Sequence, residues 1–104
     1  TEHGSTSLLL DVRSKNNYYD NHAGRSISVP LGELASWLRK NPTTQSLLFI
    51  CERGNDSRTA TRLAQSQGHR AFNVSGGMQA WRRAGLPTLS QCALALRYVG
   101  YRWY

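Results

Sequence analysis

Residues 49–68 read FICERGNDSRTATRLAQSQG, and this pattern predicts a strand, a tight loop and a helix in direct succession. The apolar run that ends at Cys51 is typical of a strand buried on both faces of a parallel sheet. The helical part precedes Gly68, a typical helix stop, and its apolar face consists of Ala60, Leu63 and Ala64. Cys51 is therefore expected at the carboxyl end of a strand, as either a nucleophile or a small buried residue.

The segments on either side repeat this alternation of patterns. Short apolar runs indicate strands, whereas apolar residues spaced three or four apart indicate helices. Strands that alternate with helices form βαβ units, in which a mostly parallel sheet is covered on both faces. The sequence therefore predicts an α/β fold. The expected strands are residues 7–14, 26–30, 46–51 and 70–74, and the expected helices are residues 31–42, 57–68 and 76–85.

The length and charge of the chain restrict its partners. A chain of 104 residues has room for one domain and is too short for two. It carries 13 Lys and Arg residues against 6 Asp and Glu residues, and the resulting net charge of +7 favours anionic partners. The arginines are scattered and no nucleic-acid-binding motif accompanies them, so nucleic acid is not an expected partner.

Cysteine content and hydropathy bear on the compartment. The apolar runs are strand-sized, well short of the roughly 18 residues that a membrane-spanning helix needs. Cys51 and Cys92 are too few for a disulfide scaffold, and neither belongs to a CxxC pair that would indicate zinc. These features favour a soluble, cytoplasmic protein. Because the chain begins with Thr1 rather than Met, it is also compatible with an excised or processed form.

Residues 88–104 form a basic aromatic C-terminal segment, which follows a complete strand-and-helix pattern that we expect to form a domain over residues 1–87. Arginines mixed with aromatic residues would suit a membrane interface or the start of a further helix. An extra strand or helix packed back on the sheet is the simpler interpretation. Contact of this segment with a membrane is therefore possible in principle but is not the favoured interpretation.

The loop after Cys51 has the composition of an anion site. Gly54 adopts positive φ readily and Asn55 tolerates it, so several backbone N–H groups can converge on one point. The helix that follows adds the positive end of its dipole. A cysteine thiol in such a place has a lowered pKa and ionises more easily.

Charged residues of the loop have opposite effects on the ionisation of the Cys51 thiol. Arg53 and Arg58 favour a thiolate and would attract an anionic substrate, whereas the carboxylates of Glu52 and Asp56 oppose ionisation. Asp56 has a second interpretation as the residue that caps the helix N-terminus. The candidate substrate-binding residues are Glu52, Arg53, Gly54, Asn55, Asp56, Ser57 and Arg58.

A thiolate here would act without a general base, because His3, His22 and His69 stand in no motif that pairs with Cys51. The chemistry is then restricted to a soft centre with a good leaving group, such as sulfur bearing sulfite, or to phosphorus. Cysteine phosphatases place an arginine after cysteine and five further residues, where it clamps the phosphate. That position is Ser57 here, so phosphatase activity is not expected.

Four stretches together resemble the rhodanese domain, a sulfurtransferase module, over about Leu8 to Pro87. They are LLLDVRS, YYDNH followed by ISVPL, FICERGNDSR, and FNVSGGMQAWRRAGLP. The resemblance implies a three-layer sandwich with a central, mostly parallel sheet of four to five strands and helices on both faces. It also implies that Cys51 is catalytic and holds a sulfane sulfur as a persulfide, wrapped by the N–H groups of the loop. No metal or organic cofactor is implied.

The chain departs from the family pattern in three places. Arg25 stands where the family usually has a glycine, and few residues precede LLLDVRS where members commonly carry an extra strand and helix. Many members active on thiosulfate have a cation where Asp56 stands. The form GNDS is similar to loops of rhodanese domains in sulfur-carrier and thiolation pathways. This similarity argues against turnover of free thiosulfate as the main activity.

We therefore expect a thiosulfate sulfurtransferase-like enzyme. Cys51 would take sulfur from a small anionic donor such as thiosulfate and pass it to a thiophilic acceptor, either cyanide or a thiol, which includes a thiol or other sulfur acceptor on a protein. The alternative is a non-catalytic module of the same fold that docks or regulates a partner.

Overall fold

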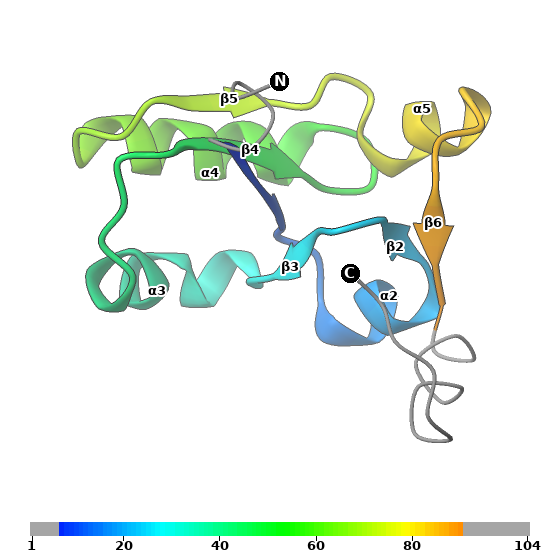
Figure 1. The fold of residues 1–104 in the computed structure, drawn as a ribbon, viewed down its shortest axis with the longest axis horizontal. Coiled ribbons are helices and arrows are strands. Elements are labelled where there is room, and N and C mark those ends of the chain that lie inside the picture. Colours follow the sequence, from blue (N-terminus) through cyan, green and yellow to red (C-terminus); the bar gives the residue numbers. More distant parts are fainter. Residues whose placement is uncertain (1–6, 91–104) are drawn as a thin grey trace.

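The structure, a computed structural model, describes residues 7–90 of the chain. Strands and helices alternate along most of it, as the pattern predicts (Figure 1). In chain order the elements are β1 (Ser7–Asp11), α2 (Lys15–Asp20), β2 (His22–Ala23), β3 (Ile27–Ser28), the 3-10 turn η1 (Leu31–Glu33), α3 (Leu34–Lys40), β4 (Ser46–Ile50), α4 (Asn55–Ser66), β5 (Ala71–Asn73), α5 (Gly77–Arg83) and β6 (Thr88–Leu89).

Four of these strands form a parallel sheet in the order β3-β1-β4-β5. The two central strands pair over their full length, from Ser7 opposite Ser46 to Asp11 opposite Ile50. Because all four strands run the same way, their carboxyl ends share one edge of the sheet, where open α/β proteins bind ligands. The expected α/β class is confirmed.

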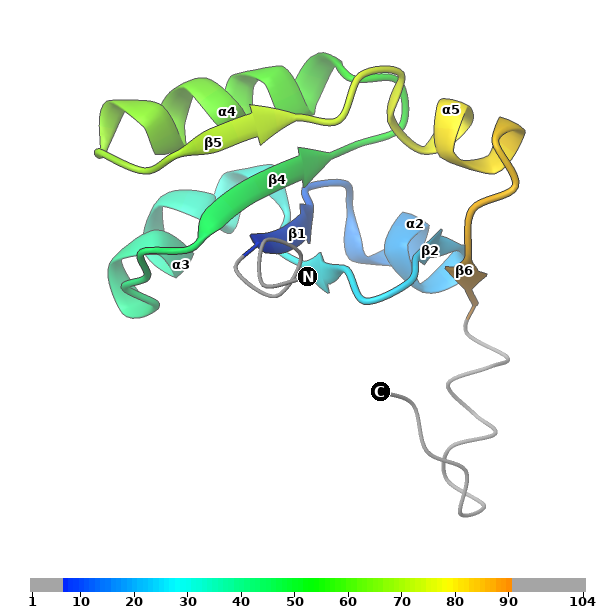
Figure 2. The same cartoon turned by 45° about the horizontal axis from the view of Figure 1, so that its top comes forward.

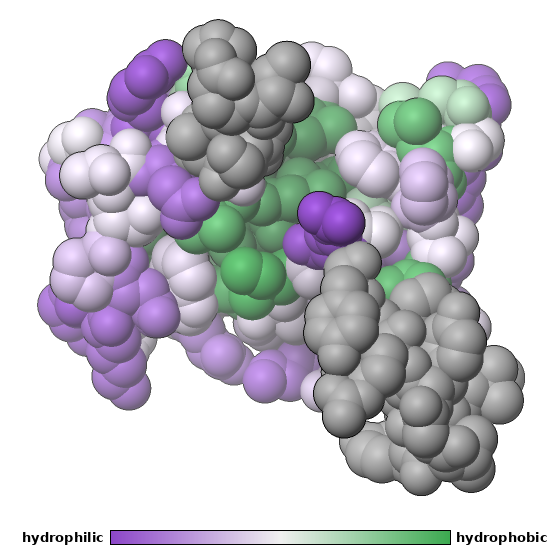
Figure 3. Space-filling view, in the orientation of Figure 1, coloured by the Kyte–Doolittle hydropathy of each residue, from purple (hydrophilic) through white to green (hydrophobic). Residues whose placement is uncertain are grey.

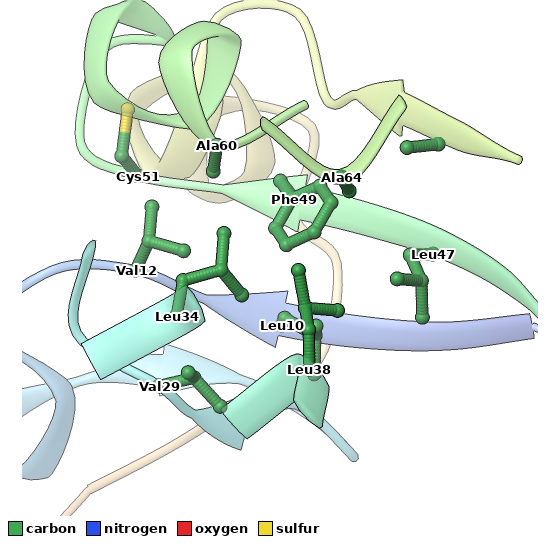
Figure 4. Close-up of a cluster of buried hydrophobic side chains, with 11 residues drawn as sticks. Leu10, Val12, Val29, Leu34, Leu38, Leu47, Phe49, Cys51, Ala60 and Ala64 are labelled. Atoms are coloured by element: carbon green, nitrogen blue, oxygen red, sulfur yellow. The ribbon is translucent and has the colours of Figure 1, made fainter. Parts of the chain in front are cut away.

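Helices α3 and α4 cover one face of this sheet (Figure 2). Between them and the strands lies the larger core, in which Leu10, Leu34 and Phe49 are completely buried. The expected helical face of α4 is confirmed, since Ala60 and Ala64 are also completely buried. Cys51 lies at one end of this core, with its sulfur pointing toward α4 (Figure 4).

The opposite face is covered mainly at the carboxyl ends of the strands. There Met78 of α5 packs with Ile50 and Ala23, and all three are completely buried. Away from these carboxyl ends the face is less covered, and Phe72 of β5 is 49% exposed. Figure 3 shows the apolar side chains that gather in the middle of this face.

Three short elements differ from the sequence-based expectations: α2 and β2 were not expected, and β6 is an extra strand at the start of residues 88–104 that does not join the main sheet. Helix α2 begins after Ser14, whose hydroxyl accepts a hydrogen bond from the Asn17 N–H at 3.3 Å. Strand β6 pairs antiparallel with β2 in a separate two-stranded sheet, and Ala23 lies opposite Thr88. The remainder of the basic aromatic segment, residues 91–104 with Cys92, lies outside the described residues.

Arg25 occupies a backbone conformation that suits glycine. Its φ is +66°, in the left-handed region, and the Ser26 N–H closes the turn by donating to the Ala23 carbonyl at 3.1 Å. A side chain in this region raises the backbone energy by roughly 1–2 kcal/mol. The loop therefore keeps the shape expected of a glycine although the residue has changed.

In the part of the chain that the structure describes, none of the helices combines the length and apolar character required to cross a membrane.

Candidate functional site

Cys51 follows the last residue of β4 at the carboxyl edge of the sheet, and it is only 3% exposed. The chain then turns sharply into α4, with Gly54 as the N-cap residue at φ +106°. Residues with a side chain rarely adopt this conformation, so glycine permits the turn. The strand, loop and helix expected from residues 49–68 are confirmed, and the turn brings the start of α4 back over the sulfur.

The Cys51 sulfur accepts hydrogen bonds from the backbone at the start of α4. The Gly54 N–H donates to Sγ at 3.0 Å and the Ser57 N–H donates at 3.3 Å. The thiol also donates to the Ser57 hydroxyl oxygen at 3.2 Å. These N–H groups are among those that a helix leaves without partners at its N-terminus. The sulfur therefore occupies the place of a capping acceptor.

This environment favours the thiolate. Burial raises the pKa of the Cys51 thiol, but the hydrogen bond with the Ser57 side chain and those from the backbone N–H groups of Ser57, Gly54 and Arg53 outweigh it. The net result is a pKa below the ordinary value for cysteine. Hydrogen bonds that favour the charged form of a group lower an acidic pKa, and the loop supplies several at once.

The other candidate residues of the loop have exposed or half-exposed side chains. Arg53, Asn55, Asp56 and Arg58 are exposed, and their side chains make no hydrogen bond or ion pair with another described residue. These side chains are open to solvent, whereas the sulfur is buried. The interpretation of Asp56 as the N-cap is wrong, because the helix begins earlier, at Asn55, and Asp56 lies in its first turn.

Glu52 carries a negative charge that two arginines offset. Arg82 of α5 donates to its carboxylate at 2.9 and 3.2 Å, and Arg13 donates at 3.2 Å. The hydrogen bonds from Arg82, together with the charges of Arg82 and Arg13, keep the pKa of Glu52 below its ordinary value despite partial burial. Glu52 thus opposes ionisation of Cys51 less than its charge alone suggests.

Asp11 and Arg13 of the DVR stretch form a buried ion pair next to Glu52. The Asp11 carboxylate accepts from Arg13 Nη2 at 2.8 Å and from Nε at 3.1 Å, and its side chain is completely buried. Arg13 Nη2 also donates to the Asn21 carbonyl at 2.6 Å. Through the contact of Arg13 with Glu52, this pair connects the loops that follow β1 and β4.

The first turn of α5 supports the loop from behind. The Met78 N–H donates to the Cys51 carbonyl at 2.7 Å, and the Gln79 N–H donates to the Glu52 carbonyl at 3.1 Å. Because these carbonyls are bound on one side, the following N–H groups can face the sulfur on the other. Sequence reasoning expected a helix at residues 76–85 but did not link it to the loop. The Gly-Gly pair was the available signal, since glycine often marks a close backbone approach.

Asn73, at the end of β5, was also missed. Its Oδ1 accepts a hydrogen bond from the Ser57 hydroxyl, and its Nδ2 faces the Gly54 carbonyl at 3.5 Å. A polar residue that ends a neighbouring parallel strand was the available signal, because such ends meet at one edge of the sheet.

Neither described histidine is placed as a base for Cys51. His22 is 2% exposed, stacks on Tyr18 with ring centroids 3.8 Å apart, and has Nδ1 2.6 Å from the Tyr18 carbonyl oxygen. His69 follows the far end of α4, a helix of 12 residues and therefore roughly 18 Å long. Across residues 7–90, no group of three His, Cys, Asp or Glu side chains is arranged to hold a metal ion.

The site, a buried cysteine wrapped by a strand-to-helix loop, agrees with what the chain resembles. Residues 2–84 match the family model described as the rhodanese-like domain. The chain belongs to the rhodanese-like family. A solved rhodanese-related protein from Thermoplasma volcanium has a TM-score of 0.76 to it and 27% identity, covering 85% of this chain and 88% of that one.

Curated relatives of this rhodanese-like domain carry sulfurtransferase names. Thiosulfate sulfurtransferase GlpE of Pseudomonas savastanoi is 29% identical over 77 residues, which are 73% of each chain. Adenylyltransferase and sulfurtransferase MOCS3-1 of Zea mays is 33% identical over 88 residues, or 77% of this chain. The match spans only 19% of the maize protein. These relatives support a sulfurtransferase kind of reaction.

Proposed function

We propose that this rhodanese-like domain transfers a sulfane sulfur through a persulfide on Cys51. The observation that carries the proposal is the set of contacts at Sγ, where two backbone N–H groups and a hydroxyl meet one buried sulfur. Such a cradle stabilises a thiolate without a general base. It also provides donors for the negative charge of a persulfide.

The reaction balances without a cofactor. The Cys51 thiolate attacks the outer sulfur of a donor such as thiosulfate, a new S–S bond forms, and the S–S bond of the donor breaks. Sulfite leaves with the electron pair of that bond, and Cys51 is left as a persulfide anion. An acceptor such as cyanide or a thiolate then attacks the terminal sulfur, which restores the Cys51 thiolate.

Phosphoryl transfer fits the loop less well. In the position where cysteine phosphatases place their phosphate-clamping arginine, this chain has Ser57, which is completely buried with its hydroxyl against the sulfur. Arg58, one residue later, is exposed. A bidentate clamp on the phosphate oxygens would need a guanidinium facing the nucleophile.

The donor and acceptor are proposed from the charges around the entrance. Arg53 and Arg58 are exposed beside the loop and would attract a small anionic donor. Asp56 lies between them in sequence and weakens that attraction, which is consistent with a thiol or protein acceptor rather than rapid turnover of a free anion. The name of the Pseudomonas relative supports thiosulfate as a donor, whereas the maize relative is named a sulfurtransferase without a stated donor.

Mass spectrometry of the thiosulfate-treated, desalted protein tests the persulfide. The peptide that contains Cys51 should gain one sulfur atom, and treatment with cyanide should remove it. The peptide that contains Cys92 is the internal control and should gain none. A Cys51→Ser variant that still releases sulfite at the parent rate would refute the proposal. Repeated absence of the added sulfur would instead favour the non-catalytic docking module.

Removal of the entrance charges tests their role. The double variant Arg53→Ala/Arg58→Ala should raise the KM for thiosulfate several-fold, with a smaller effect at high salt. The double variant Arg62→Ala/Arg70→Ala, which removes two exposed arginines farther along the chain from Cys51, is the charge-matched control and should change KM much less. Equal effects of both changes would mean that only net charge matters.

A further inference from the structure

The Ser57 hydroxyl lies between two groups that compete for its single proton. Its oxygen is 3.2 Å from Cys51 Sγ, and the hydroxyl donates to Asn73 Oδ1 on the neighbouring strand. Ser57 is completely buried, so water does not supply an alternative partner. In the arrangement that the structure shows, the thiol donates to Ser57 and Ser57 donates to Asn73.

The backbone around Asn73 fixes which atom of its amide faces Ser57. Nδ2 lies 3.5 Å from the Gly54 carbonyl oxygen, so the opposite orientation would place two oxygen acceptors against each other. The strand is held in place as well, since the Val74 N–H donates to the Phe49 carbonyl at 2.8 Å. Oδ1 is thereby presented to the Ser57 hydroxyl as an acceptor.

Ionisation of Cys51 reverses the hydrogen bond between the sulfur and the Ser57 hydroxyl, so that the hydroxyl becomes the donor. When the thiol proton leaves to solvent, the sulfur becomes an acceptor and can no longer donate to Ser57. The Ser57 O–H then turns from Asn73 Oδ1 to the thiolate, and Oδ1 loses its partner. No proton leaves Ser57. The thiol state satisfies Asn73, whereas the thiolate state satisfies the sulfur.

We propose that Asn73 is a positioning residue that acts on Cys51 through Ser57, by competing with the sulfur for the Ser57 hydroxyl proton. Asn73 favours the thiol form of Cys51, whereas Ser57 favours the thiolate form. The proposal deepens the proposed function, because it concerns the form of Cys51 that attacks the donor. Its readout is the thiol pKa, which is measured without any sulfur transfer, so the two proposals can fail separately.

The test is the pH profile of Cys51 alkylation by iodoacetamide, resolved by mass spectrometry so that Cys92 does not contribute. Asn73→Ala frees the Ser57 hydroxyl for the thiolate, so the pKa of Cys51 should fall by roughly half to one unit. Ser57→Ala removes the hydroxyl, so the pKa should rise. In the Ser57→Ala background, Asn73→Ala should produce no further shift.

Asn73→Asp distinguishes this role from a structural one. A carboxylate still accepts from Ser57 and adds a like charge near the sulfur, so the pKa of Cys51 should rise. If Asn73 merely held the Gly54 carbonyl, its replacement by alanine or aspartate would loosen the loop in both cases and raise the pKa in both. A raised or unchanged pKa in Asn73→Ala therefore overturns the proposal. If that variant does not fold, Asn73→Val, whose side chain suits a strand, replaces it, and the same fall in the pKa of Cys51 is expected.

Discussion

Gly77 begins α5 at the point where this helix meets the loop that follows Cys51, and it has φ +56°. A Cβ built at this residue would overlap the Cys51 carbonyl oxygen and lie 2.7 Å from the Glu52 carbonyl oxygen. Both acceptors are backbone atoms that cannot rotate away. Replacement of Gly77 by alanine must therefore move the loop, the helix or both.

The expected loss of stability has two parts. A left-handed residue with a side chain is strained by about 1 kcal/mol or somewhat more. The displaced helix would also weaken its hydrogen bonds to the Cys51 and Glu52 carbonyls, each of which contributes about 1 kcal/mol. We expect Gly77→Ala to reduce the free energy of unfolding by about 3 kcal/mol, a large part of the stability of a small domain.

Gly85→Ala is the matched control. Gly85 has φ +71°, but a Cβ there would meet nothing within 4 Å. Its replacement should lower the free energy of unfolding by only about 1 kcal/mol. The effect of alanine on the unfolded chain is the same at both positions, so it cancels in the comparison. The difference between the two variants measures the contact between α5 and the loop.

Urea denaturation gives the two free energies, and iodoacetamide alkylation gives the pKa of Cys51. Gly77→Ala should raise this pKa because the loop N–H groups are drawn away from the sulfur, whereas Gly85→Ala should not change it. Equal losses of stability with an unchanged pKa in both variants would refute the inference that α5 supports the loop.

Three further predictions concern the charges of the site. The alkylation midpoint of Cys51 should lie at lower pH in the folded than in the urea-unfolded protein, because the fold stabilises the thiolate. This stabilisation is complete above the pKa of Cys51 in the unfolded protein, and it should disappear as the pH falls through the pKa of Cys51 in the folded protein. Asp11→Asn should lower the free energy of unfolding by about 3–5 kcal/mol in urea titrations, because it leaves Arg13 buried without its main partner. Glu52→Gln should lower it by no more than about 1 kcal/mol, since the pair with Arg82 is exposed, and this loss should shrink in high salt.

Local features of this chain were predictable because their causes lie within a few residues. The strand before Cys51, the apolar face of α4 and the sharp turn at Gly54 follow from side-chain periodicity and from the conformational freedom of glycine. The short pairing of β6 with β2 was missed, since two-residue strands carry no periodicity of their own. The N-cap was misassigned to Asp56, because the sulfur of Cys51 already accepts N–H groups that a capping side chain would otherwise bind.

Local sequence patterns were sufficient to predict the α/β class, the place of Cys51 at a strand end and the loop that wraps it. The distant groups that complete the site could be identified only from the fold. Asn73 reaches Ser57 because β5 pairs with β4, and Arg82 reaches Glu52 because α5 packs at the same edge. Their pairing depends on the order of the strands in the sheet, which brings residues far apart in the chain within hydrogen-bonding distance, and no local pattern records that order.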